Sequence, residues 1–309
     1  MIPIALVTGF LGSGKTSFLQ HCTQQYGHRR LAYIVNEFAA VDVDGQTLEL
    51  PPDQLVTIPG GSIFCRCLVT EFIRHLDQLA AARGPSQGPA LEGVIIEASG
   101  IADPKVFRQM LAETGLDMTY RLASIVTIID PDTFADLLET LPNITAQVEA
   151  ASSAIINKCD QHARADLDRT ETLLRRINPA LTIHRTSFAA VDVELFDHAA
   201  TDGPTGTYAP CTDPNFGRIQ ITPADDLDPI ALTERLALIR PIVYRVKGFI
   251  RTGGRLCHLD VSRSGVTLRP TSRQNVVPSL VCVLPPHVVP QLRPLLDRIA
   301  TGDLSGLAD

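Results

Sequence analysis

The sequence predicts an α/β fold, a mainly parallel sheet flanked by helices, followed by a smaller α+β domain. Three observations predict it. An apolar run at residues 2–8 leads directly into a glycine-rich turn and then into a helical pattern. Strand and helix patterns alternate through the first two-thirds of the chain, which is typical of a parallel sheet covered on both faces. The composition changes near residue 200, so we expect a first domain over 1–200, a linker over 201–215 and a second domain over 216–309.

Composition and charge indicate which classes of protein this sequence can belong to. Hydrophobic residues make up 45% of the 309 and charged residues 20%, as in packed soluble proteins. The net charge of −7 argues against a nucleic-acid or anionic-membrane partner. No apolar run reaches the roughly 18 residues of a membrane helix, and the N-terminus does not resemble a signal peptide. Seven scattered cysteines favour a reducing cytoplasm over a disulfide framework.

The first strand and the turn after it predict a phosphate-binding loop. Residues 2–8 suit a buried parallel strand, and residues 9–16 have the spacing G-x-x-x-x-G-K-[ST]. The glycines let backbone N–H groups point at phosphate oxygens, and a helix over 17–26 adds its N-terminus. Lys15 can reach the β- and γ-phosphates, and the Thr16 hydroxyl is the natural Mg²⁺ ligand. The expected nucleotide contacts are Gly9, Gly12, Ser13, Gly14, Lys15, Thr16 and Ser17.

The remaining elements follow the same reasoning from apolar periodicity. Further strands are predicted at 31–36, 55–58, 94–97, 125–130, 154–157 and 181–186, with helices at 71–83, 105–113 and 165–177. In the second domain we predict strands at 218–221, 242–250, 256–262, 265–268 and 280–284, and helices at 230–239 and 288–299. Pro290 and Pro294 weaken the last helix. Nucleotide is expected at the carboxyl ends of the parallel strands.

Asn157-Lys158-Cys159-Asp160 follows its own strand and has the guanine-reading pattern N-K-x-D. The Asp160 carboxylate can accept from N1–H and N2–H₂ of guanine, whereas adenine would leave it unpaired. Asn157 would brace the loop, and the Lys158 stem would cover the base. Ser187, at the end of the next strand, would help complete the base pocket through the backbone, although an ordinary turn is nearly as good an interpretation.

Two acidic residues at strand ends are candidates for the magnesium shell. Glu97 is placed to hold Mg²⁺ through water or to orient the attacking water, and the Gly100 N–H can approach the γ-phosphate. Glu37 opens a loop over 37–46 that could order around the γ-phosphate, facing Mg²⁺, a water or a second metal. We therefore interpret Lys15, Glu37 and Glu97 as catalytic. The alternatives are a capping glutamate at 97 and a solvated loop acid at 37.

Cys65-Arg66-Cys67 is the candidate for a second metal. Two thiolates suit Zn²⁺, Cu(I) or Fe²⁺, but tetrahedral zinc needs further ligands that the sequence does not show. Arg66 would lower the thiolate pKa values, so a redox role is open as well. Two structural cysteines are the third interpretation.

Together these motifs resemble the cobalamin-synthesis-protein W-like (CobW-like) branch of a metal-linked P-loop GTPase family. That family also includes GTPases that mature nickel enzymes or serve cobalamin-dependent mutases. The resemblance rests on Gly9-Phe-Leu-Gly-Ser-Gly-Lys-Thr16, Val35-Asn-Glu-Phe38 with Asp44-Gly45, Glu97-Ala-Ser-Gly-Ile-Ala-Asp-Pro104, Asn157-Lys-Cys-Asp160 and, in the second domain, Tyr244-Arg-Val-Lys-Gly-Phe249. Glu97 stands where most GTPases carry Asp. The family usually has Cys-x-Cys-Cys after the position of Gly61; here only Cys65 is kept and Cys67 is added, and the histidine-rich linker of many relatives is absent.

The resemblance implies a GTP-hydrolysing metallochaperone or metal-insertion factor with a client metalloprotein. GTP and Mg²⁺ would be its cofactors, with Thr16, Glu37 and Glu97 around the Mg²⁺. Cys65 and Cys67 would bind a transition metal, with Zn²⁺ favoured and Co²⁺ or Fe²⁺ as alternatives. The rival interpretations are a metal-free GTPase switch that gates loading of an organometallic cofactor, and a redox-sensing GTP-binding module. Analogy alone suggests a homodimer.

Overall fold

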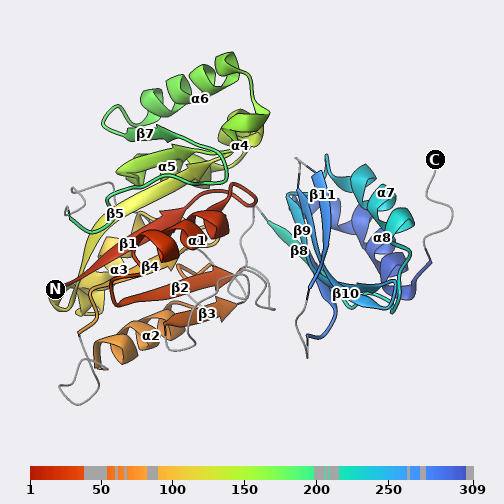
Figure 1. Ribbon diagram of the computed structural model, residues 1–309, viewed down its shortest axis with the longest axis horizontal. Helices are drawn as coiled ribbons and strands as arrows, with labels where there is room; N and C mark the ends of the chain where they lie inside the picture. The colour runs from red at the N-terminus through yellow and green to blue at the C-terminus, as the bar shows by residue number, and fades with distance from the viewer. Residues whose placement is uncertain are drawn as a thin grey trace. The chain divides into compact units, whose positions relative to one another are not determined.

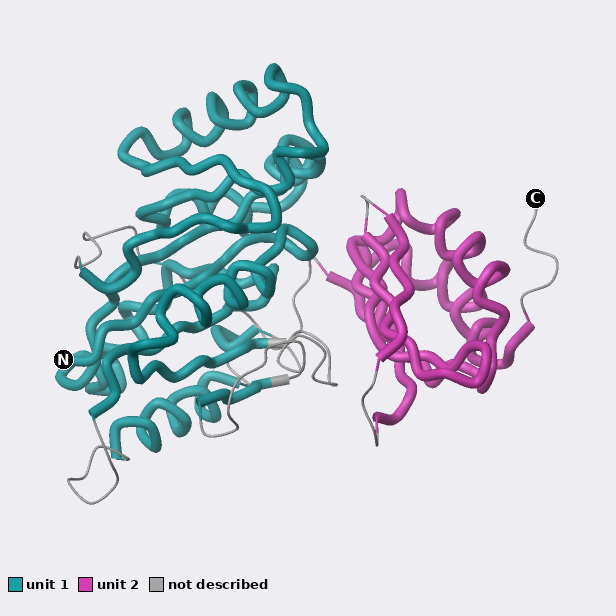
Figure 2. The backbone as a smooth tube through the Cα atoms, viewed as in Figure 1, with its two compact units in different colours: residues 1–211 teal, residues 212–309 magenta. Residues whose placement is uncertain are grey.

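The structure is a computed structural model that describes residues 1–37, 54–59, 62–65, 68–81, 90–197, 206, 208, 216–262, 265–271 and 276–303. The chain divides into two compact units, Met1–Cys211 and Thr212–Asp309 (Figure 2). Most of the linker predicted over 201–215 lies outside the described residues, so its bounds stay a prediction.

The first unit contains a seven-stranded sheet in which every neighbouring pair is parallel (Figure 1). The strand order is β3-β2-β4-β1-β5-β6-β7, which places β1 at the centre between β4 and β5. The strands are β1 (Ile2–Thr8), β2 (Leu31–Glu37), β3 (Leu55–Pro59), β4 (Gly93–Glu97), β5 (Tyr120–Ile129), β6 (Ser153–Ile156) and β7 (Thr182–Arg185). The predicted α/β class is confirmed.

Helices flank this sheet: α1 (Lys15–Gln25), α2 (Val69–Ala81), α3 (Val106–Glu113), α4 (Pro131–Thr140), α5 (Pro142–Ala150) and α6 (Arg164–Ile177). α4 and α5 are not among the helices predicted above from the sequence. Asp130 begins α4 by accepting a hydrogen bond from the Asp132 N–H at 3.2 Å, and Pro131 occupies the first helical turn. This combination is a recognised start signal, so α4 was predictable from local sequence.

Burial explains why β1 can stand at the centre. Ile4, Ala5, Leu6 and Val7 are all fully buried, because neighbouring side chains on a strand face opposite sides and both sides are covered. On one face, Ala5 and Val7 share a core cluster with Phe18, Leu19 and Cys22 of α1. The strand that carries the glycine-rich turn is therefore anchored on both sides.

The second unit is a five-stranded sheet of order β11-β10-β9-β12-β8 in which every neighbouring pair is antiparallel. Its core includes Leu232 and Leu236 of α7 and Leu292 and Leu296 of α8, packed with alternate residues of the strands. The predicted smaller α+β unit is confirmed, and α8 forms with Pro294 inside it. The elements are β8 (Gly217–Ile221), α7 (Pro229–Ile239), β9 (Arg245–Thr252), β10 (Arg255–Ser262), β11 (Gly265–Pro270), β12 (Ser279–Leu284) and α8 (Val289–Thr301).

Across both units, none of the helices in the described ranges combines the length and the apolar composition needed to span a bilayer.

Candidate nucleotide-binding site

The predicted motifs of the first unit meet at one edge of its sheet. β1 leads into the glycine-rich turn, β4 ends at Glu97, β2 at Glu37, β6 just before Asn157 and β7 just before Thr186. Because all the strands are parallel, their carboxyl ends share an edge, where open α/β sheets bind ligands. Val7 of β1 lies beside Glu97 of β4 in the register, so the turn and the acid are neighbours.

The glycine-rich turn has the backbone that its sequence predicts. Gly9, Gly12 and Gly14 have φ of 131°, 83° and 110°, values that residues with a Cβ rarely adopt. A Cβ on Gly14 would also clash with Nδ2 of Asn157. The Lys15 side chain is buried, and its Nζ donates to the carbonyl oxygens of Gly9 at 2.9 Å and Phe10 at 3.3 Å. The ammonium thus lies inside the turn, at the start of α1, where a phosphate group would meet both positive charge and backbone N–H groups.

Asn157 ties the candidate base-reading loop to the glycine-rich turn. It is 3% exposed, its Nδ2 donates to the Ser13 carbonyl at 2.9 Å, and its Oδ1 accepts from the Ala189 N–H at 2.8 Å. One side chain therefore holds together two loops that a nucleotide would bridge. The sequence analysis predicted the bracing but not its partners.

The rest of the base-reading loop leaves the Asp160 side chain accessible. Asp160 is exposed, and its N–H donates to the Ser187 Oγ at 3.1 Å. Lys158 has a left-handed φ of 59°, and its Nζ pairs with the Asp130 carboxylate at 2.5 Å. Asp130, which sequence reasoning missed, therefore holds Lys158 at the strand end. An acid that directly follows a buried strand was the available signal.

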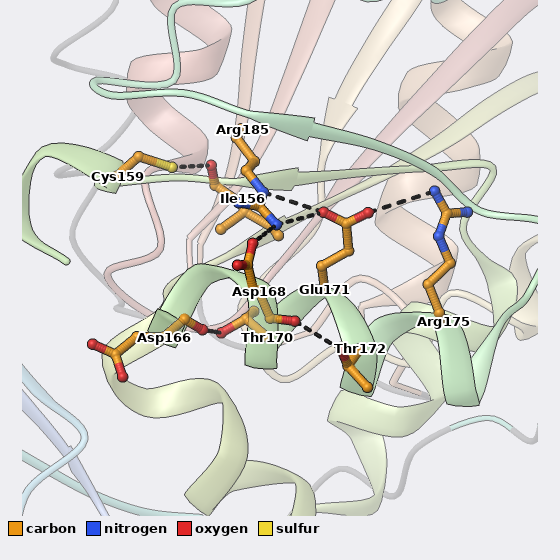
Figure 3. Close-up of polar contacts among 9 residues, drawn as sticks. All are labelled: Ile156, Cys159, Asp166, Asp168, Thr170, Glu171, Thr172, Arg175 and Arg185. Atoms are coloured by element: carbon orange, nitrogen blue, oxygen red, sulfur yellow. Dashed lines mark hydrogen bonds and ion pairs between the residues drawn. The ribbon is translucent and has the colours of Figure 1, made fainter. Parts of the chain in front are cut away.

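An ionic network joins the end of β7 to α6 (Figure 3). Arg185, the last residue of β7, donates to Asp168 at 2.7 Å and to Glu171 at 2.8 Å. In the same view the Cys159 thiol donates to the Ile156 carbonyl at 3.3 Å. Burial raises the pKa of Cys159, which keeps this thiol protonated. Cys159 therefore has a structural role in the loop.

The turn after β4 packs against the glycine-rich turn. The Ala98 N–H donates to the Val7 carbonyl at 2.9 Å, and a Cβ on Gly100 would lie only 2.7 Å from the Leu11 nitrogen. Gln147 of α5 donates to the carbonyl oxygens of Gly100 and Ala102 at 3.2 and 3.1 Å. Gln147 was not predicted, because α5 was missed.

The residues of this edge suit a magnesium ion. Glu97 is 2% exposed at the end of β4, and the Thr16 hydroxyl is in the first turn of α1. A carboxylate and a hydroxyl are hard oxygen donors of the kind Mg²⁺ prefers. The side chain of Glu37 and the loop 38–46 lie outside what the structure describes.

Cys65 lies in a buried turn four residues before α2 begins at Val69. It is 4% exposed, and Phe64 beside it packs edge-on against Phe107 of α3 with ring centroids 5.9 Å apart. Cys67 lies outside the described residues, so the proposed thiolate pair stays a prediction. Within the described ranges, no group of three or more His, Cys, Asp or Glu side chains could hold a metal ion.

Comparison with known proteins agrees with this geometry. The family described as CobW/HypB/UreG, nucleotide-binding domain, matches residues 3–185, more than half of the chain. The zinc chaperone CobW of Pseudomonas aeruginosa is 29% identical over 191 residues, covering 52% of this chain and 49% of that protein. The zinc chaperone YjiA of Escherichia coli is 27% identical over 198 residues, covering 63% and 60%. The chain thus aligns with about half to three-fifths of the length of these relatives.

Among solved structures, Zn(II)-bound YjiA GTPase from E. coli aligns over 96% of this chain and 98% of that one, with a TM-score of 0.47 and 17% identity. The hydrogenase maturation factor HypB from Archaeoglobus fulgidus aligns over 60% and 81%, with a TM-score of 0.41 and 15% identity. By the match over residues 3–185, this chain belongs to the CobW/HypB/UreG family.

Proposed function

We propose that the chain binds and hydrolyses GTP at the carboxyl edge of its parallel sheet. The observation that carries this proposal is the Asn157 amide, which joins Ser13 of the glycine-rich turn to Ala189 in the loop after β7. A guanine nucleotide has its base and its phosphates at opposite ends, so it needs both loops held in one geometry. Family membership supports the same ligand.

Each group at the edge then has a role. The N–H groups of residues 9–14 and Lys15 hold the phosphates, and Asp160 accepts hydrogen bonds from guanine. Thr16, Glu37 and Glu97 would hold Mg²⁺ and orient water. Bound Mg²⁺ would neutralise the charge on the β- and γ-phosphates. The Gly100 N–H would contact the γ-phosphate, a role supported by the close approach of Gly100 to Leu11 in the glycine-rich turn.

We further propose that GTP turnover serves delivery of a metal, with zinc as the favoured cargo and a metalloprotein as the client. Two relatives are named zinc chaperones, and Cys65 with Cys67 supplies two soft ligands. Free thiols of this kind need a reducing compartment, and we propose the cytoplasm.

An anaerobic zinc titration tests this function, read as bound zinc and as GTPase rate. We expect GTP hydrolysis in the presence of Mg²⁺, and a zinc stoichiometry that falls in Cys65→Ser with Cys67→Ser. Cys22→Ser is the matched control, because Cys22 is fully buried and burial raises its pKa to about 12. Absence of GTP binding would end the proposal. Equal zinc stoichiometry in the wild type and the double variant would contradict zinc binding by Cys65 and Cys67, but not the GTPase activity.

A second candidate, a GTPase switch without metal, is favoured by one observation. Cys65 is 4% exposed, in a turn whose Ile63 and Phe64 side chains are also buried, so this thiol has a structural environment. In that case GTP binding and hydrolysis persist, and the double cysteine variant changes neither zinc stoichiometry nor rate.

A further inference from the structure

We propose that Asn36 is a positioning residue that couples the phosphate end of the nucleotide site to the cysteine-bearing turn, residues 62–65. This inference rests on the proposed function, because it assigns how nucleotide state reaches Cys65. The Asn36 side chain is 4% exposed. Its Oδ1 accepts from the Ile63 N–H at 2.9 Å and from the Ser99 N–H at 3.2 Å. One oxygen thus serves two segments far apart in the sequence.

The Ser99 side of this bridge responds to the phosphates. Ser99 lies in the turn after β4, between Ala98, which is bonded to Val7, and Gly100, which packs on Leu11 of the phosphate loop. A γ-phosphate that engages the Gly100 N–H would pull on this turn. Since Ser99 is 3% exposed, loss of the bond to Asn36 would leave its N–H without this partner in a buried turn, which is costly.

The Ile63 side of the bridge holds Cys65. The Cys65 N–H donates to the Ser62 carbonyl at 2.9 Å, and the Ser62 Oγ accepts from the Phe64 N–H at 3.2 Å. The Cys65 carbonyl in turn accepts from the Val69 N–H at 3.1 Å, at the start of α2. These bonds make residues 62–65 a closed turn, so a shift at Ile63 also moves Cys65.

The other end of the amide fixes its orientation. Nδ2 of Asn36 donates to the Ile58 carbonyl near the end of β3 at 3.1 Å. This bond selects the rotamer in which Oδ1 faces both N–H donors. The amide is therefore oriented from a third segment, with its oxygen directly joining the turn at Ile63 to the turn at Ser99.

The experiment measures alkylation of Cys65 by iodoacetamide, residue by residue with mass spectrometry, in zinc-free protein. The protein is saturated with GDP or with the non-hydrolysable analogue GMPPNP and Mg²⁺. We expect the rate at Cys65 to differ about fivefold between the two states in the wild type. Asn36→Ala, which removes the oxygen shared by Ile63 and Ser99, should bring the ratio to about one. Asn178→Ala is the matched control, because that amide also makes three backbone hydrogen bonds, away from the nucleotide edge.

Several outcomes would overturn the inference. They are an equal Cys65 rate in the two states of the wild type, an unchanged ratio in Asn36→Ala, or the same loss of the ratio in the control Asn178→Ala. If Asn36→Ala does not fold, amide hydrogen exchange of the wild type decides: exchange at Ile63 and Ser99 must change together between the two states. Nucleotide affinity is measured on the same samples. Failure to bind GDP and GMPPNP would contradict the proposed function. Normal nucleotide binding with a Cys65 alkylation rate that is the same in both states would contradict only this inference.

Discussion

Removing the Asn157 amide tests whether one side chain organises the nucleotide site. Asn157→Ala deletes the 2.9 Å bond to the Ser13 carbonyl and the 2.8 Å bond from the Ala189 N–H. A buried hydrogen bond contributes about 0.5–1.5 kcal/mol net, so two bonds correspond to a loss of about 1–3 kcal/mol in unfolding free energy. Because the bonds join the two loops, we also expect GDP affinity to fall about 10- to 100-fold, equivalent to about 1.4–2.7 kcal/mol.

The assay separates stability from binding by comparing this variant with Asn178→Ala. Asn178 donates to the Val148 and Ala151 carbonyls at 3.1 and 3.0 Å and accepts from the Ala180 N–H at 3.1 Å. Both variants should lower the thermal midpoint, but only Asn157→Ala should weaken GDP binding in a calorimetric titration. If Asn157→Ala binds GDP like the wild type, or if Asn178→Ala weakens binding equally, the reasoning is refuted.

Three further predictions address base choice, phosphate binding and pH. Asp160→Asn should weaken GTP binding and favour xanthosine triphosphate, whose 2-oxo group accepts from the new amide; competition titration checks this, and retained GTP preference contradicts it. Lys15→Ala should abolish nucleotide binding or turnover, and a variant with wild-type turnover would exclude Lys15 as the phosphate ligand. Burial, aided by nearby Lys247, lowers the pKa of His258 from 6.5 to about 4, so the folded second unit favours neutral imidazole. The contribution of neutral His258 to the free energy of unfolding should be fully present above pH 6.5. It should decrease as the pH falls toward 4, by up to about 1.4 kcal/mol per pH unit. Hydrogen exchange of β9 and β10 measures this decline, which His258→Gln should flatten; an equal decline in that variant would assign it to other groups.

Much of the first unit could be predicted from short stretches of sequence. The bends at Gly9, Gly12 and Gly14 depend on local backbone freedom, so their spacing was sufficient to predict the loop. Strands such as β1 and β4 were predicted because a strand buried on both faces is a continuous apolar run. Of the two helices that were not predicted, α4 has a local start signal in Asp130 and Pro131, whereas α5 follows directly after Leu141 with no capping side chain and weak apolar periodicity.

The contacts that assemble the site were not predictable in this way. The bond from Asn157 to Ser13 spans 144 positions, and those from Asn36 span 22, 27 and 63. Such pairs depend on strand order, and alternation of strands and helices does not specify that β4 lies between β1 and β2. The packing next to Cys65 has the same origin, because Phe64, its neighbour in sequence, contacts Phe107 of α3.

The amino-acid sequence alone therefore determined the parallel sheet and the backbone of the glycine-rich turn, and it carries the prediction that residues 157–160 read guanine, because each depends on residues within short segments. The tertiary structure decided which amides join those segments and how far the cysteine is buried. The physical reason is that buried hydrogen bonds between distant strands form only once the order of the sheet has brought their ends together.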